Sequence, residues 1–326
     1  MNDVVTEGTV QIPARTIPMP QYLSDAARAY LTPQPDGEPF PPIGDKAAWR
    51  AYVSASEQAI LPMLRHINAQ SGAEAIVEQF TAGQASIFDI LPSGANRESR
   101  GIVLEIHGGG LFICGGELCQ LMGVGLAARL QKRVWAVDYR MPPDHPYPAA
   151  LDDCLDAYRA LLRERSPSEI IVSGGSAGGN LAAALVLRAR DEVLPLPAGV
   201  ILNTPEVDLT ESGDSFHTNM GVDPGLRSLM TVNQLYANGQ DLAHPYLSPL
   251  FGDFDKGFPP TLLTTGTRDL YLSNTVRMHR ALRKANIPAE LHVLEAGAHT
   301  GFPGSPEGEE INREIVRFID TVLRQG

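Results

Sequence analysis

The sequence predicts an α/β protein in which a mostly parallel sheet of about eight strands is flanked by helices. From residue 101 onward, short runs of apolar and β-branched residues alternate with stretches of helical periodicity. This alternation is typical of a parallel sheet covered on both faces. The composition agrees, because 43% hydrophobic and 20% charged residues is ordinary for a globular protein. At roughly 150 residues per domain, the chain would make about two domains, but α/β folds often take this length as one.

The first hundred residues predict a different pattern. Residues 1–44 are rich in proline and glycine, so we expect irregular structure with one short helix at 25–30. Apolar residues then recur at helical spacing, which predicts an amphipathic helix over 45–71. Two apolar, β-branched runs, 75–80 and 85–91, predict a hairpin that adds a mixed edge to the sheet.

The alternating part of the chain supplies the remaining strands and helices. Its expected strands are 101–107, 133–139, 169–174, 198–203, 261–266 and 290–295. Its expected helices are 117–131, 148–164, 177–190, 273–285 and 308–324.

One interval breaks this rhythm, since the residues from 204 to 260 carry no strand–helix unit. They do contain a helical stretch at about 223–237. A long insertion within a compact domain is usually functional or disordered. We therefore expect a cap over the strand ends, made of residues 1–70 and 205–245. The catalytic core would then be residues 71–204 and 246–326.

Charge and cysteine content exclude several classes of protein. The net charge is −12 and no run of Lys or Arg exceeds two residues, which argues against nucleic-acid binding. Three cysteines cannot all pair within one chain, so a disulfide framework is not expected. We therefore expect the protein to reside in the reducing cytoplasm. The first residues lack the features of a signal peptide, and no run of 18 apolar residues predicts a membrane span. No HExxH or clustered Cys/His pattern predicts a metal site.

The clearest chemical signal is GxSxG at Gly174–Gly178, between an expected strand and an expected helix. In this setting a tight turn lets a strained serine project its hydroxyl, so Ser176 is the expected nucleophile. Gly174 and Gly178 would support that turn. The helix N-terminus at Ser176 also favours developing negative charge. The alternative interpretation is a glycine-rich turn with an incidental serine.

A second signal, His107-Gly108-Gly109-Gly110, follows the strand at 101–107. Glycines there allow backbone N–H groups to approach a substrate oxygen, as an oxyanion hole requires. We expect Gly109, Gly110 and Ala177 to supply these donors, with His107 and Gly108 in support. The alternatives are a tight loop or a phosphate-binding turn, but no lysine follows at the spacing of a phosphate loop.

With Tyr139–Ala149 (YRMPPDHPYPA) between them, these two motifs resemble those of the hormone-sensitive-lipase-like esterases, or bacterial family IV, of the α/β-hydrolase fold. The resemblance runs from about residue 75 to the C-terminus. It implies an α/β-hydrolase fold with a helical cap, a Ser–Asp–His triad, ester substrates and no cofactor. By analogy with the family, we also expect a homodimer formed through the last strand and helix.

The α/β-hydrolase chain order of serine, acid and histidine directs the search for the other two residues. Asp269 follows the strand at 261–266, and His299 follows the strand at 290–295. Both positions match the acid and the base of the family. The alternatives are a helix N-cap for Asp269 and a surface-loop role for His299. Asp208 is the second choice for the acid.

The chain departs from the family pattern at three places. Gly175 stands where the family most often has an acidic residue, so we hypothesise that a supporting hydrogen bond is absent or supplied by Glu206 or Asp208. The residues after Asp269 also differ, and Thr300 lengthens the segment after His299. These departures concern the substrate more than the reaction.

The expected function is hydrolysis of short- to medium-chain acyl esters by a serine carboxylesterase. A lactone hydrolase that uses the same triad is the alternative, and a noncatalytic ligand-binding relative is a further one. Gly123–Ala128 spells the dinucleotide fingerprint GxGxxA, but it lies within an expected helix, so no nucleotide cofactor is expected. The apolar residues expected to select the substrate are Trp49, Phe216, Leu226, Met230 and Tyr236.

Overall fold

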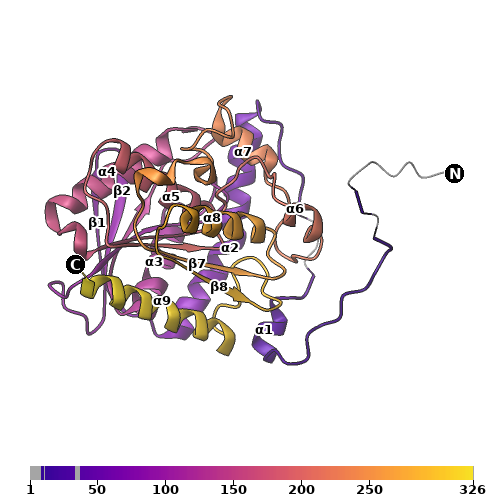
Figure 1. Ribbon diagram of the computed structural model, residues 1–326, viewed down its shortest axis with the longest axis horizontal. Coiled ribbons are helices and arrows are strands. Elements are labelled where there is room, and N and C mark those ends of the chain that lie inside the picture. Colours follow the sequence, from indigo (N-terminus) through magenta and orange to yellow (C-terminus); the bar gives the residue numbers. More distant parts are fainter. Residues whose placement is uncertain (1–8, 11, 34–36, 326) are drawn as a thin grey trace.

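The computed structural model describes residues 9–10, 12–33 and 37–325, and within them eight strands form one sheet (Figure 1). The strand order is β1-β2-β4-β3-β5-β6-β7-β8. Strand β2 is antiparallel to β1 and β4, and every other pair is parallel. This arrangement confirms the predicted mixed edge and parallel body. The strands are β1 (Ala75–Ala82), β2 (Ala85–Pro92), β3 (Ile102–Ile106), β4 (Arg133–Asp138), β5 (Ile170–Gly175), β6 (Gly199–Asn203), β7 (Thr261–Gly266) and β8 (Ala289–Leu294).

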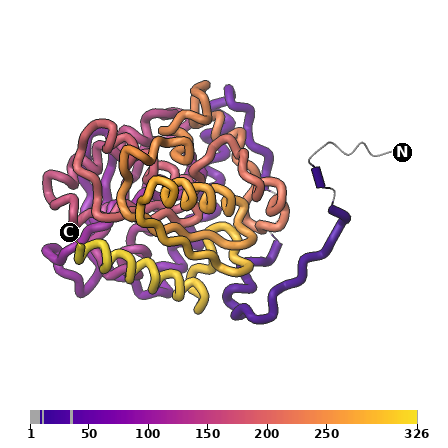
Figure 2. Tube along the Cα trace, in the orientation of Figure 1, coloured from indigo at the N-terminus to yellow at the C-terminus, as the bar shows by residue number. Residues whose placement is uncertain are grey.

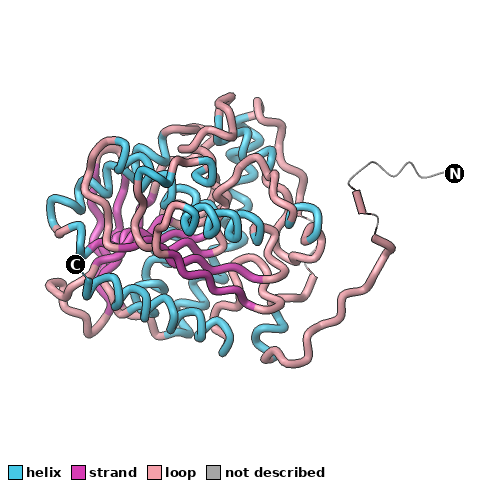
Figure 3. The backbone as a smooth tube through the Cα atoms, viewed as in Figure 1, coloured by secondary structure: helices cyan, strands magenta, loops and turns pink. Residues whose placement is uncertain are grey.

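The helices of the alternating region lie within two residues of their predicted bounds. Helices and loops surround the strands of the sheet (Figure 3). Short 3-10 turns occur at 167–169, 249–251 and 254–256. None of the helices in the described ranges has the length and apolar character that crossing a bilayer requires. The helices are α1 (Asp25–Ala29), α2 (Lys46–Ser71), α3 (Glu117–Leu130), α4 (Ala149–Glu164), α5 (Ala177–Asp191), α6 (Ser215–Thr218), α7 (Met230–Ala237), α8 (Leu272–Lys284) and α9 (Pro306–Gln325).

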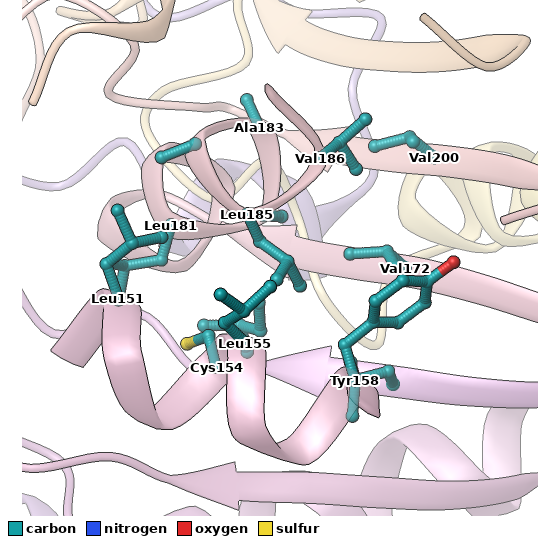
Figure 4. Packing of buried hydrophobic residues seen from close by; sticks show 14 of the residues in the cluster. Leu151, Cys154, Leu155, Tyr158, Val172, Leu181, Ala183, Leu185, Val186 and Val200 are labelled. Atoms are coloured by element: carbon teal, nitrogen blue, oxygen red, sulfur yellow. The ribbon is translucent and has the colours of Figure 1, made fainter. Parts of the chain in front are cut away.

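Two hydrophobic cores hold the helices against the sheet. Alternate residues of a strand point to opposite faces, so Ile171 of β5 packs with α3 and α9 while Val172 packs with α4 and α5. Figure 4 shows part of this second core, in which Leu155 of α4 lies near Leu185 of α5 and the Tyr158 ring of α4 lies near Val172. Both faces of the central strands are therefore buried, as their continuous apolar runs predict.

The segment before the sheet contains both predicted helices. Asp45 caps α2 by accepting a hydrogen bond from the backbone of Ala48 at 3.0 Å. Trp49 is the residue of α2 that is completely buried, whereas Met63 on the same helix is 56% exposed. Before α1, the chain extends away from the body (Figure 2). The irregular structure expected of residues 1–8, 11 and 34–36 lies outside the described residues.

The insertion between β6 and β7 differs from its prediction. The helix expected over 223–237 begins only at Met230, as α7. Pro224 follows Asp223, and the Asp223 side chain accepts hydrogen bonds from the N–H groups of Gly225 and Leu226. An Asp side chain that binds its own downstream backbone favours a turn over a helix, which accounts for the shorter helix.

The insertion and the N-terminal segment meet in an aromatic and aliphatic cluster. Phe112 follows β3, and Leu270 follows β7, so this cluster lies at the carboxyl ends of the parallel strands. We call it the cap cluster, and its buried members are Trp49, Phe112, Phe216, Leu229, Val232, Leu235, Leu270 and Tyr271.

Candidate active site

The candidate nucleophile lies where the strand order reverses. The chain proceeds from β3 to β4 on one side and then places β5 on the other side of β3, so the loops after β3 and β5 diverge. In open α/β sheets this switch point is where ligands bind. Ser176 follows β5 directly, and the glycines of 108–110 follow β3.

The backbone around Ser176 requires its glycines. Ser176 has a φ of 55°, a conformation that L-residues rarely adopt. A Cβ added at Gly174 would lie 2.2 Å from the carbonyl oxygen of Gly178, and one added at Gly178 would lie 1.9 Å from that of Ile106. The tight strand-to-helix turn predicted from GxSxG is therefore present, and α5 begins immediately after Ser176.

The structure brings the three residues expected to form the triad together. His299 Nε2 lies 2.9 Å from Ser176 Oγ, and His299 Nδ1 lies 3.1 Å from Asp269 Oδ1. The residue that caps α8 is Tyr271, so Asp269 is not its N-cap. The His299 side chain is only 11% exposed, which excludes the surface-loop alternative.

Asp269 is held by further hydrogen bonds. It is completely buried, and its carboxylate accepts from Thr265 Oγ1 at 2.8 Å and from the N–H of Tyr271 at 2.9 Å. Buried carboxylates need such donors to remain charged. With His299 as a third partner, Asp269 has a fixed orientation toward the imidazole.

The surroundings of His299 favour its charged form. Burial lowers the pKa of His299, whereas the Asp269 hydrogen bond and the negative charges of Asp269, Asp223 and Glu206 raise it. The raising effects are together larger than the effect of burial, so the pKa lies above its ordinary value of 6.5. The ring of Tyr271 contacts the imidazole edge to face, with centroids 5.0 Å apart.

The glycines after β3 lie directly against Ser176. A Cβ on Gly108 would lie 3.4 Å from the Ser176 Cβ, and Gly109 has a φ of 110°. In the part of the chain that the structure describes, the N–H groups of Gly109 and Gly110 donate no hydrogen bond within the chain. Free backbone donors beside a serine hydroxyl are what an oxyanion hole consists of.

His107 holds this loop in place. Its ring stacks on Tyr139, with centroids 4.1 Å apart, and the Tyr139 hydroxyl donates to the His107 carbonyl at 2.8 Å. Burial lowers the pKa of His107 to about 4, so the ring is neutral at physiological pH. The geometry agrees with the supporting position expected of His107.

Two acidic residues considered in the sequence have different surroundings. Asp208 accepts hydrogen bonds from Thr210, Ser212 and Arg277, whereas the carboxylate that contacts His299 Nδ1 is that of Asp269. Glu206 is completely buried, and burial raises its pKa to about 7. Its backbone N–H donates to the Ser176 carbonyl at 3.1 Å.

The residues expected to select the substrate are only partly brought together. Trp49, Phe216 and Leu226 belong to or pack against the cap cluster, and Met230 begins α7 as a partly buried residue. Tyr236 is different, since it is completely buried in the core formed by Val172, α4 and α5, and its ring contacts Tyr147 instead. Helical spacing alone could not separate the inward face of α7 from a substrate-facing one.

Sequence reasoning missed several neighbours of the site. Glu57 of α2 accepts hydrogen bonds from the backbone of Cys114 at 2.9 Å and Gly115 at 3.3 Å, which ties α2 to the loop after the glycines. A groove of about 640 Å³ opens beside Phe112, between α2 and residues 141–145. The triad does not line this groove. No sequence motif signals these long-range contacts.

The GxGxxA pattern at Gly123–Ala128 lies within α3. A Cβ on Gly123 would lie 2.5 Å from Ile90 and 2.9 Å from Ala136, so this glycine permits close packing of α3 on the sheet. Ligand atoms of His107, Cys119 and Asp138 lie within 4.8 Å of one another, a group that the sequence did not predict. They come from the end of β3, from α3 and from the end of β4, and none of them has a hydrogen bond with the three triad residues among the described residues.

Comparison with known proteins identifies the family. Residues 103–303 match the model of a family described by the α/β-hydrolase fold, which is more than half of the chain. This chain belongs to the α/β-hydrolase family. The family member described as an esterase of Acinetobacter venetianus is 35% identical over 233 residues, which are 68% of this chain and 75% of that protein.

Solved structures place the chain among the esterases of the hydrolase family. The esterase E25 has a TM-score of 0.87 and 35% identity, covering 96% of this chain and 98% of its own. An esterase from the bacterial hormone-sensitive lipase family has a TM-score of 0.72 and 27% identity, covering 88% and 93%. The resemblance to hormone-sensitive-lipase-like esterases is thereby confirmed.

Proposed function

We propose that this α/β-hydrolase is a serine carboxylesterase that hydrolyses short- to medium-chain acyl esters through an acyl-enzyme. The observation that carries the proposal is the relay of Ser176, His299 and Asp269, joined by contacts of 2.9 and 3.1 Å. Its nucleophile lies at a helix N-terminus beside free backbone donors. Membership of a family of esterases supports the reaction class.

In the proposed mechanism, His299 Nε2 takes the proton of Ser176 as Oγ attacks the ester carbonyl carbon. Asp269 holds Nδ1–H and stabilises the imidazolium that forms. The N–H groups of Gly109, Gly110 and Ala177 hold the oxyanion. The imidazolium then gives its proton to the leaving alcohol, and water hydrolyses the acyl-enzyme by the same route.

The cap cluster supports a restricted acyl pocket. A Cβ on Gly110 would lie 2.9 Å from the Phe112 ring and 3.4 Å from Leu229, so these side chains lie against the proposed oxyanion hole. Long acyl chains would have to displace them. We therefore propose that residues 1–70 and 205–245 act as a cap that selects the substrate, over a core of residues 71–204 and 246–326.

Partners and location complete the proposal. The substrate is a small ester or lactone, with no cofactor and no nucleic acid, which agrees with the charge of −12. The described cysteines Cys114, Cys119 and Cys154 are free and buried, as in a protein of the reducing cytoplasm. A homodimer through β8 and α9 remains the proposal from family analogy.

The proposed function is tested by hydrolysis of p-nitrophenyl acetate, butyrate, octanoate and laurate at neutral pH with a chelator present. We expect activity that peaks at the short chains and is abolished in Ser176→Ala. Ser99→Ala, an exposed serine remote from the site, is the matched control and should retain wild-type rates. If all four esters remain intact while a γ- or δ-lactone is opened in a Ser176-dependent way, the lactonase alternative holds; no turnover of either class leaves the ligand-binding alternative.

A further inference from the structure

We propose that Asn219 and Asp223, in the insertion between β6 and β7, are positioning residues that hold the acid and base loops of the triad in register. This inference rests on the proposed function, because the register matters only if Asp269 and His299 act on Ser176. Neither residue touches Ser176, and both belong to the proposed cap. The cap would thereby control the alignment of the triad as well as the choice of substrate.

The first observation is that both residues bind one peptide group. Asn219 Nδ2 donates to the carbonyl oxygen of Asp269 at 2.8 Å, and to that of Thr267 at 3.2 Å. Asp223 Oδ2 accepts from the N–H of Leu270 at 3.0 Å. The Asp269 carbonyl and the Leu270 N–H are the two ends of the same peptide unit. The insertion therefore fixes the orientation of the backbone that carries Asp269.

The second observation is that the same carboxylate oxygen reaches the other loop. Asp223 Oδ2 also accepts from the backbone N–H of His299 at 3.0 Å. One atom thus joins the loop after β7 to the loop after β8, and those two loops carry the proposed acid and base. A displacement of Asp223 would change the separation of Asp269 and His299 together.

The third observation is that the pair is itself rigidly held. The other oxygen of Asp223 accepts from Gly225 at 3.0 Å and from Leu226 at 3.1 Å, and its backbone N–H donates to the Asn219 carbonyl at 2.9 Å. Asp223 is only 4% exposed. Among the described residues it forms no salt bridge, so its charge is neutralised only by N–H dipoles.

That unpaired charge also acts on His299. The charged and titratable groups that act on the imidazole are Asp269, Asp223 and Glu206, and the ring of Tyr271 packs on its edge. Removing the Asp223 charge should lower the pKa of His299, whereas removing the Asn219 amide should not. The two variants therefore share a positioning effect and differ in an electrostatic one.

The test measures kcat, KM and the pH dependence of kcat/KM for Asp223→Asn and Asn219→Ala with the best p-nitrophenyl ester. We expect kcat to fall by about 10-fold to 100-fold in both, the range that a displaced reacting group costs, with KM within about threefold of wild type. In Asp223→Asn alone, the acidic limb of the profile should move to lower pH. Asp241→Asn removes an exposed carboxylate from the same insertion and is the matched control, with no change expected.

Two results would overturn the proposal that Asn219 and Asp223 position the triad loops. A kcat within about threefold of wild type in both variants overturns the proposal, and so does a loss in Asp223→Asn that leaves the acidic limb in place, since that loss would be structural. If Asp223→Asn does not fold, Asn219→Ala decides, with thermal unfolding to verify its fold. A wild-type protein without Ser176-dependent activity contradicts the proposed function instead.

Discussion

Ser176 and the glycines around it show how single residues determine the backbone geometry of the candidate site. A φ of 55° at a non-glycine residue costs about 1–3 kcal/mol, and folds retain such strain mainly where function needs it. Gly174 and Gly178 make the turn sterically feasible, and a Cβ on Gly108, next to Gly109, would lie 3.4 Å from the Ser176 Cβ. The sequence predicted these residues because glycine is needed wherever a Cβ would collide with backbone.

Gly109→Val tests the oxyanion assignment. The valine Cβ would lie 2.3 Å from the carbonyl oxygen of Ile113, so the loop has to move. The N–H group of residue 109 would then no longer point toward the proposed oxyanion. Loss of one oxyanion donor typically costs about 10²–10³ in turnover, and we expect a fall in kcat of that size. Gly94→Val is the matched control, since Gly94 also has a positive φ, of 83°, but open space around it. Full activity in Gly109→Val would refute the assignment.

The pH dependence of kcat/KM tests the role of His299. A general base must be neutral, and the pKa of His299 is raised above 6.5 by its hydrogen bond with Asp269 and by nearby negative charge, which outweigh burial. Activity should therefore be complete above that pKa and decline as pH falls through it. A pH–rate profile with an acidic limb below pH 6.5 would contradict this assignment.

Trp49 is the residue through which α2 contacts the loop after β3. It is completely buried, stacks with Phe40 at 5.9 Å and contacts Phe112 edge to face at 5.8 Å. Aromatic pairs of this kind add to the hydrophobic stabilisation of buried rings. We attribute the fixed position of α2 over the strand ends to this contact and to the hydrogen bonds of Glu57.

Trp49→Ala should destabilise the protein by about 3–5 kcal/mol, the usual cost of removing a large buried aromatic side chain. Met63→Ala, on the exposed face of the same helix, should change the free energy of unfolding by less than about 0.5 kcal/mol. Urea-induced unfolding followed by circular dichroism measures both. Equal stability of the two variants would show that the cap cluster does not anchor α2.

The bounds of elements with a strong hydrophobic period were predicted within two residues. A sheet covered on both faces requires continuous apolar strands and amphipathic helices, and both patterns are visible in the sequence. The insertion was predicted less well. The Asp223 carboxylate accepts hydrogen bonds from the N–H groups of residues 225 and 226, which favours a turn there, so α7 begins later than predicted. Local sequence propensity cannot reveal that the Asp223 side chain also binds backbone N–H groups 47 and 76 residues away in the sequence.

At the scale of the whole molecule, the sheet order explains why residues far apart in the sequence meet. Parallel strands end at one edge, so the loops after β3, β5, β7 and β8 converge there. Chain order and motif spacing therefore predicted that Ser176, Asp269 and His299 would lie together, and the structure places them in contact. Asn219 and Glu57 contact these loops through hydrogen bonds between residues far apart in the sequence, and no pattern in the sequence indicates those bonds. Tyr236 was misplaced for the same reason.

The most direct test of the central claim is covalent labelling of the nucleophile. Wild type, Ser176→Ala and His299→Ala are treated with an alkyl fluorophosphonate, and the intact proteins and their peptides are weighed by mass spectrometry. We predict one adduct per wild-type chain, located on Ser176, none in Ser176→Ala and much slower labelling in His299→Ala. An adduct on another residue, or equal labelling of Ser176→Ala, would contradict the account.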